Sequence, residues 1–194
     1  MDSIDYYNQY ATQYYKDTVN LELDDIRNEF IDYLPEDSEI MDLGCGSGRD
    51  SLYFMERGFD VTAVDGSKEL CELASIHIGQ DVLNLNYNEL DFSDVFDGVW
   101  ACASFTHSSR RELVEILGKI HESLKDGGIL FMSFKYGDFD GVRNNKYYKY
   151  YHTKEIKDII DEYNGFTMLK INKANDIRPE RFDEKWIHVI AKKE

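Results

Sequence analysis

A short apolar run, EIMDL (39–43), leads directly into the glycine-rich turn GCGSG (44–48) and then into the amphipathic pattern of a helix. Glycines on alternate positions give the main chain backbone angles and close approaches that side chains would prevent. A strand, a glycine turn and a helix in this order are typical of open α/β sheets, which bind ligands beyond the carboxyl ends of their strands. The first amides of the helix favour a polar or anionic group there. The junction therefore predicts both a fold class and the place of a ligand.

Strand-like and helical patterns alternate along the rest of the chain. The strand-like runs lie at 60–64, 81–85, 96–104 and 127–135, and the helical patterns at 49–57, 67–77, 110–124 and 154–163. This alternation predicts a doubly wound α/β fold with a mostly parallel sheet. Two final strand-like runs, 166–174 and 185–193, have no helix between them, so we expect them to pair as a hairpin with one antiparallel strand. Before the sheet, residues 3–34 predict two helices broken near Val19 and Asn20.

The chain shows no internal boundary. It has 194 residues, only two prolines, Pro35 and Pro179, and no linker or repeat, so we expect a single domain over 1–194. The formal net charge is −16, from 22 Lys and Arg against 38 Asp and Glu, which repels nucleic-acid backbones. We therefore expect no nucleic-acid partner.

The cysteines and the apolar runs indicate a cellular compartment. The three cysteines, Cys45, Cys71 and Cys102, are odd in number and lack metal-ligand spacing, which favours reduced thiols and no metal site. We expect Cys102 to belong to the core. No apolar run is long enough to span a bilayer, and the first residues do not form a signal peptide. We expect a cytoplasmic monomer or homodimer without membrane contact.

The next strand-like run ends in Asp65, about twenty positions after the glycine turn, where an acid can accept hydrogen bonds from both hydroxyls of a ribose. A dinucleotide fingerprint would need glycine at position 49, which is arginine, and no P-loop Gly-Lys-Ser/Thr follows. These features predict a nucleoside-containing cofactor and weaken the case for a dinucleotide.

The stretches IMDLGCGSGRDSLYF (40–54) and VTAVDGS (61–67) resemble the first two motifs of class I S-adenosylmethionine-dependent methyltransferases. The stretch GRDSLYFMERGFDVTAVDGS (48–67) is similar in particular to the tellurite-resistance and thiopurine methyltransferase-like branch, whose acceptors are small. The resemblance covers roughly residues 3–135 and implies a seven-stranded, Rossmann-like sheet with N-terminal helices and an antiparallel last strand. It also implies S-adenosylmethionine as the cofactor.

The resemblance assigns residues to the cofactor position by position. Asp42 would position the glycine loop, the main chain at Gly44 and Gly46 would face the methionine part, and Asp65 would take the ribose. The other cofactor-binding residues that we expect are Tyr14, Cys45, Arg49, Gly66, Ser67, Asn86, Tyr87 and Ala103.

Several of these roles have a structural alternative. Gly66 and Ser67 would lie against the adenine, and Asn86 stands where the family often has an acid for the adenine amino group. Arg49 either pairs with the cofactor carboxylate or forms a solvated ion pair on its helix. Asp42 either binds or only braces the turn.

The acceptor side follows from topology rather than from a motif. The loops 104–108, about 136–152 and about 175–184 leave the later strands, so they should rim the cofactor site. The substrate-binding residues that we expect there are Phe105, Tyr136, Tyr150, Arg178, Arg181 and Trp186. The run KYYKYY (146–151) is either a substrate lid or a set of buried tyrosines beside solvated lysines. Arg178 and Arg181 either clamp an anion or pair with the acids around them.

A base is needed only if the acceptor must lose a proton, and His107 is the best-placed candidate. It stands just before a helix cap, so packing or capping is its alternative role. Tyr6, Tyr10 and Tyr14 either form a lid over the cofactor or pack as ordinary helix residues.

The sequence therefore predicts S-adenosylmethionine-dependent methyl transfer to a small molecule. ACASF (101–105), after the fourth strand, lacks the Asx-Pro-Pro-aromatic motif of enzymes that methylate nucleic-acid amines. Two other hypotheses stay open: a nicotinamide-dependent oxidoreductase, and a non-catalytic subunit that binds S-adenosylmethionine.

Overall fold

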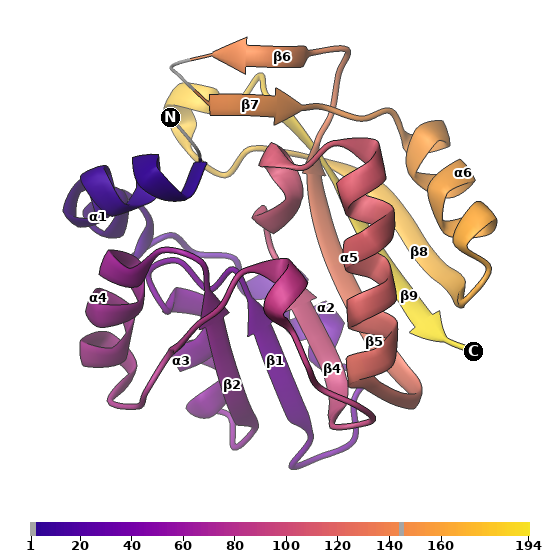
Figure 1. Cartoon of the computed structure of the whole chain (residues 1–194), viewed down its shortest axis with the longest axis horizontal. Helices are drawn as coiled ribbons and strands as arrows, with labels where there is room; N and C mark the ends of the chain where they lie inside the picture. Colours follow the sequence, from indigo (N-terminus) through magenta and orange to yellow (C-terminus); the bar gives the residue numbers. More distant parts are fainter. Residues whose placement is uncertain (1–2, 144–145) are drawn as a thin grey trace.

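The computed structural model describes residues 3–143 and 146–194. Seven strands form one sheet in the order β3-β2-β1-β4-β5-β9-β8 (Figure 1). The strands are β1 (Glu39–Leu43), β2 (Asp60–Asp65), β3 (Leu83–Asn84), β4 (Phe96–Ala101), β5 (Leu124–Lys135), β8 (Phe166–Asn175) and β9 (Lys185–Lys193). β9 runs antiparallel to both β5 and β8, and the remaining neighbours pair in parallel. The predicted mostly parallel seven-stranded sheet, with its last strand antiparallel, is confirmed.

Helices cover both faces of the sheet. They are α1 (Ser3–Thr18), α2 (Asp24–Ile31), α3 (Arg49–Met55), α4 (Lys68–Ile78), α5 (Arg110–Ser123) and α6 (Thr153–Tyr163). One core contains residues of α5 and α6, such as Ile116 and Ile159, together with Met41 and Val99 of the sheet. The core on the other face joins Phe30 of α2 and Phe54 of α3 to the strands. The break between α1 and α2 falls at residues 19–23, as the sequence predicts.

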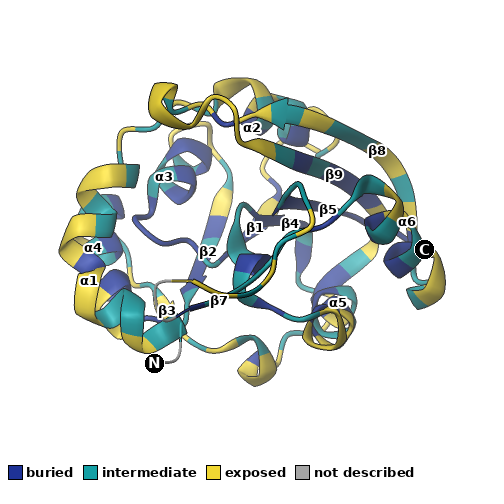
Figure 2. Ribbon diagram, turned by 90° about the horizontal axis from the view of Figure 1, so that it is seen from above, coloured by how far each residue is buried: buried dark blue, intermediate teal, exposed yellow. Residues whose placement is uncertain are grey.

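Aromatic stacking fills the centre of the second face. Trp100 of β4 is fully buried and stacks on Phe131 of β5 with ring centroids 4.0 Å apart. Seen from above, the central strands are buried, whereas the outward faces of α1 and α4 are exposed (Figure 2). This core fixes the carboxyl ends of β1, β2 and β4, where the glycine turn lies.

One element was not expected. The segment predicted as an irregular loop, 136–152, contains a small hairpin of β6 (Asp140–Arg143) and β7 (Lys146–Lys149). The hairpin is a separate two-stranded sheet, and β7 contacts α1 and the short helix η2 (Ser104–His107). The reason is local: the tyrosines of β7 have no alternating apolar pattern, so they resemble a polar loop in the sequence. The segment expected as a substrate lid thus contains a strand, β7, that lies beside α1 (Figure 1).

Candidate active site

The glycine turn is tied to the neighbouring strand and crowded by its surroundings. The amides of Gly44 and Cys45 donate to the carbonyl of Val64, at 2.8 and 3.0 Å. Gly44 and Gly46 have left-handed φ angles of +77° and +56°. A Cβ at Gly44 would lie 2.6 Å from the hydroxyl of Ser104, and one at Gly46 would lie 3.0 Å from the ring of Tyr14. Close approach therefore requires glycine here, as the sequence predicts.

Asp65 ends β2 with its carboxylate fixed by two main-chain donors. The amide of Gly46 donates to one carboxylate oxygen at 2.9 Å, and the amide of Ser67 donates to the other at 2.8 Å. Burial raises the pKa of Asp65, and these two amide donors oppose that rise. The carboxylate is thereby oriented, and its remaining lone pairs are available to a ligand.

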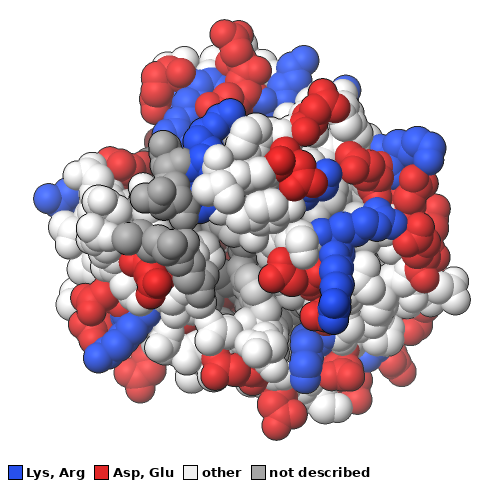
Figure 3. Space-filling model, turned by 45° about the horizontal axis from the view of Figure 1, so that its top comes forward, with Lys and Arg blue, Asp and Glu red and all other residues white. Residues whose placement is uncertain are grey.

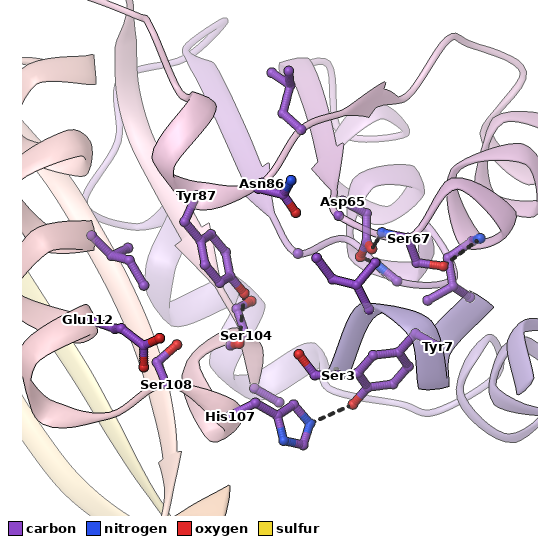
Figure 4. A pocket seen from close by; sticks show the side chains of 18 of the residues that line it. Ser3, Tyr7, Asp65, Ser67, Asn86, Tyr87, Ser104, His107, Ser108 and Glu112 are labelled. Atoms are coloured by element: carbon purple, nitrogen blue, oxygen red, sulfur yellow. Dashed lines mark hydrogen bonds between the residues drawn. The ribbon is translucent and has the colours of Figure 1, made fainter. Parts of the chain in front are cut away.

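A pocket of about 660 Å³ opens above these residues. Its walls come from α1, the glycine turn, the end of β2, the segment after β3, η2 and α5 (Figure 4). Uncharged side chains make up much of the surface around the central hollow in the space-filling view (Figure 3). The predicted residues that line the pocket are Tyr14, Gly44, Gly46, Asp65, Gly66, Ser67, Asn86, Tyr87, Ala103 and His107.

Three predicted cofactor residues lie behind the turn instead of in the pocket wall. Asp42 is buried and accepts a hydrogen bond of 2.6 Å from Ser51 at the start of α3. Arg49 makes a two-pronged contact with Asp50, at 2.8 and 2.7 Å. Cys45 is buried against α4. These side chains support the turn. For Asp42 this is the bracing role that the sequence left open, and Arg49 forms an ion pair on its helix, although the pair is buried and not solvated.

Asp50 is a supporting residue that the sequence analysis missed. It is 5% exposed and accepts hydrogen bonds from Arg49 and, at 2.9 Å, from the indole of Trp100. Arg27 of α2 lies 3.6 Å from it. The Arg49 contact, followed by that of Arg27, lowers the pKa of Asp50 against the effect of burial. A buried carboxylate with three cationic or N–H partners holds the start of α3 against the core.

Cys102 lies between the core and the pocket. It packs against the core around Trp100 and Phe131, as expected, but it is only partly buried and also lines the pocket, because β4 ends one residue earlier at Ala101. Burial raises the pKa of its thiol to about 12, so the sulfur stays protonated at neutral pH.

His107 and Tyr7 face each other at one side of the pocket (Figure 4). The Tyr7 hydroxyl lies 2.9 Å from Nε2 of His107, and Nδ1 of His107 lies 2.7 Å from the carbonyl of Tyr147. Burial lowers the pKa of His107 to about 4. Tyr7 was not among the tyrosines chosen from α1, since all of them share the same helical pattern.

The predicted substrate residues lie elsewhere. Phe105 is fully buried against Tyr87 and Phe134, because η2 turns its ring into the core. Arg178 and the indole of Trp186 both bind Asp176, at 2.8 and 2.9 Å. The six residues Phe105, Tyr136, Tyr150, Arg178, Arg181 and Trp186 are all absent from the walls of this pocket. Arg178 thus forms an ion pair within the protein, which is one of the two roles predicted for it. Its partner is Asp176, an acid that the sequence analysis did not consider.

Comparisons with known proteins agree with this geometry. A family described as "Methyltransferase domain" matches residues 40–128. A Bacillus subtilis protein named as the methyltransferase YqeM is 32% identical over 104 residues, which are 50% of this chain and 42% of that protein. An uncharacterized methyltransferase of Staphylococcus carnosus is 23% identical over 185 residues, 91% of this chain and 88% of its own. The chain thus spans less than half of the first relative and most of the second.

A solved structure shares the fold. It is Burkholderia thailandensis 1,6-didemethyltoxoflavin-N1-methyltransferase with 1,6-didemethyltoxoflavin and S-adenosylhomocysteine bound. Its TM-score is 0.77 at 22% identity, and the match covers 95% of this chain and 85% of that one. This chain therefore shares the fold of that methyltransferase, and its residues 40–128 match the methyltransferase-domain family. That structure holds S-adenosylhomocysteine, the product that remains when the cofactor implied by the resemblance gives up its methyl group. In the described part of the chain, no helix is both long and apolar enough to cross a bilayer.

Proposed function

We propose that this chain transfers a methyl group from S-adenosylmethionine to a small molecule bound in the same pocket. The observation that carries the proposal is the oriented carboxylate of Asp65 beside a turn whose glycines admit no side chain. This pair of features suits an adenosyl amino acid, since a ribose offers two hydroxyls to one carboxylate and the turn offers its main chain.

Different pocket residues would contact different parts of the cofactor. Asp65 would accept the ribose hydroxyls, and Gly44 and Gly46 would face the amino acid part. Ser67, Asn86 and Tyr87 would surround the adenine, which agrees with their place in the pocket wall. Asn86 is held by Glu89, whose carboxylate accepts from its amide nitrogen at 2.8 Å. The side-chain oxygen of Asn86 caps the short helix that follows it, and its second lone pair can accept from an amino group.

When bound, the cofactor supplies an electrophilic methyl group on a sulfonium. The chain aligns the acceptor and excludes water. Tyr7 and Tyr14 pack edge to face with ring centroids 5.1 Å apart, and both line the pocket. Tyrosine faces stabilise a desolvated cation by up to about 2 kcal/mol. An aromatic wall of this kind favours binding of the charged donor.

The acceptor we propose is a small uncharged or aromatic molecule. α1 contributes one wall of the pocket, and most of the residues that line it are uncharged, although Asp65, Glu112, Glu115 and Lys119 also line it. The Burkholderia protein, which has the same fold, was solved with a small heterocycle. We propose more specifically that this chain belongs to the tellurite-resistance and thiopurine methyltransferase-like branch, which the sequence Gly48-Arg49-Asp50 resembles.

The test is a turnover screen. The chain is incubated with S-adenosylmethionine and single acceptors from a panel of phenols, heterocyclic amines, carboxylates, thiols and tellurite, and S-adenosylhomocysteine is measured by mass spectrometry. We expect product with at least one acceptor and much less with Asp65→Asn. Tight binding of S-adenosylhomocysteine without turnover on any acceptor would contradict catalysis and favour a non-catalytic binding subunit.

A further inference from the structure

Tyr7 belongs to a hydrogen-bond chain with a fixed direction. The carbonyl of Tyr147 can only accept, so Nδ1 of His107, 2.7 Å away, must carry a hydrogen. A neutral imidazole has only one N–H, so Nε2 offers a lone pair. The Tyr7 hydroxyl, 2.9 Å from Nε2, therefore donates its single hydrogen to His107 (Figure 4).

The surroundings keep both groups neutral. Burial, followed by the nearby charge of Lys146, lowers the pKa of His107 to about 4, although the Tyr147 carbonyl opposes this. Burial raises the pKa of Tyr7 well above 10. The Lys146 ammonium lies 3.7 Å from the ring centre of Tyr6 and 4.7 Å from that of Tyr7. At neutral pH a second proton on His107, or loss of the Tyr7 proton, is therefore unfavourable.

We propose that Tyr7 determines specificity: its oxygen offers only lone pairs to the pocket and selects acceptor molecules that present an O–H or N–H group to it. The inference rests on the proposed function and names the substrate class of that same pocket. A carboxylate or an O-alkylated analogue bound beside Tyr7 would bring its own oxygen lone pairs against those of the Tyr7 hydroxyl. No hydrogen bond would form, and a buried oxygen would be left without a partner. His107 then acts as a positioning residue through Tyr7.

The direction of the chain can be measured without any acceptor. Long-range ¹H–¹⁵N NMR on protein with labelled histidine should show His107 as the Nδ1–H tautomer from about pH 5.5 to 8.5. In Tyr7→Phe the Nε2 resonance should shift, because its donor is lost. An Nε2–H tautomer would make Tyr7 the acceptor in this bond and would overturn the proposal.

Selectivity can be measured with four probes of similar shape: phenol, aniline, anisole and benzoate. Each is titrated into the complex with S-adenosylhomocysteine. We expect phenol and aniline to bind about tenfold more tightly than anisole and benzoate, as one hydrogen bond near 1.4 kcal/mol allows. Tyr7→Phe should remove this preference. Tyr15→Phe is the matched control, because Tyr15 lies on the same helix against His77.

A second variant should shift the ligand preference in the opposite direction. In His107→Leu the Tyr7 hydrogen has no imidazole to bind, so it becomes available to a ligand and benzoate should gain affinity relative to phenol. Equal binding of all four probes to the wild type, or an unchanged order in both variants, would overturn the proposal.

Binding of S-adenosylhomocysteine separates this inference from the proposed function. If the wild type does not bind it, the proposed function fails. If wild type and Tyr7→Phe bind it equally but the probes show no donor preference, only the inference fails. A tenfold loss of cofactor affinity in Tyr7→Phe would assign Tyr7 to the cofactor and also overturn it.

Discussion

Gly44 and Gly58 have similar left-handed backbones but different surroundings. Their φ angles are +77° and +88°, yet an added Cβ would meet Ser104 at 2.6 Å at Gly44 and nothing within 4 Å at Gly58. Alanine should cost about 1–2 kcal/mol of stability at either position through backbone strain. Gly44→Ala should cost more, because it displaces Ser104, and should also weaken S-adenosylhomocysteine binding. Urea unfolding measures the loss of stability, and calorimetry measures the loss of S-adenosylhomocysteine affinity. Equal losses of stability in Gly44→Ala and Gly58→Ala would contradict crowding at Gly44.

The raised pKa of Asp42 predicts that the free energy of unfolding depends on pH. Burial, followed by repulsion from Asp50, raises the pKa of Asp42 above its ordinary value. The folded chain then holds more protons than the unfolded chain between the two pKa values, so this group lowers stability as pH rises from about 4 toward neutral. Asp42→Asn should remove this trend, while the exposed Asp60→Asn should not. Parallel curves of unfolding free energy against pH for wild type and Asp42→Asn would contradict it.

The candidate site could be predicted from the sequence only in part, for a physical reason. Asp65 and the glycines were identifiable because their places along the chain coincide with strand ends. Tyr7 was not, because the tyrosines of α1 share one helical pattern and only the fold decides which of them faces His107. Topology places Trp186 and Arg178 at the strand ends, but it does not show that both turn toward Asp176.

At the scale of elements, the sheet was predictable and the hairpin was not. β5 and β9 are apolar runs that pair over many residues, whereas β6 and β7 contain exposed charges and tyrosines whose partners lie on α1 and η2. Strands buried on both faces are visible in a sequence, but a strand stabilised by distant rings is not.

Lys146 links the β6–β7 hairpin to α1 and predicts a second pH dependence. It is 6% exposed, and burial lowers its pKa to about 8. Because this value is below the ordinary 10.5, the folded chain holds fewer protons between about pH 8 and 10.5, and stability from this group rises with pH there. Lys146→Met should lack this rise, which we expect to be about 3 kcal/mol for a pKa shift from 10.5 to about 8.

The control for Lys146 is Lys154→Met, whose side chain is 84% exposed beside Asp158. It should keep the wild-type dependence of unfolding free energy on pH. If Lys146→Met and Lys154→Met gave the same curve, the ammonium would not be buried between the rings.

At the scale of the whole molecule, one sheet connects all the strand-bearing segments except the hairpin. We predict that the chain unfolds as a single domain, since both helical layers share the strands of that sheet. Urea unfolding followed by tryptophan fluorescence and by circular dichroism should give one coincident transition. Two separated transitions would contradict a single domain.

The central claim is that the glycine turn and Asp65 bind an adenosyl amino acid. The most direct measurement is calorimetric titration of S-adenosylhomocysteine into the wild type, Asp65→Asn and Asp60→Asn, which changes an exposed residue at the other end of β2. We predict binding to the wild type and to Asp60→Asn with equal affinity, and a loss of about 10–100-fold in Asp65→Asn, the range expected for hydrogen bonds to a charged group. No binding to the wild type, or equal binding to all three proteins, would contradict the account.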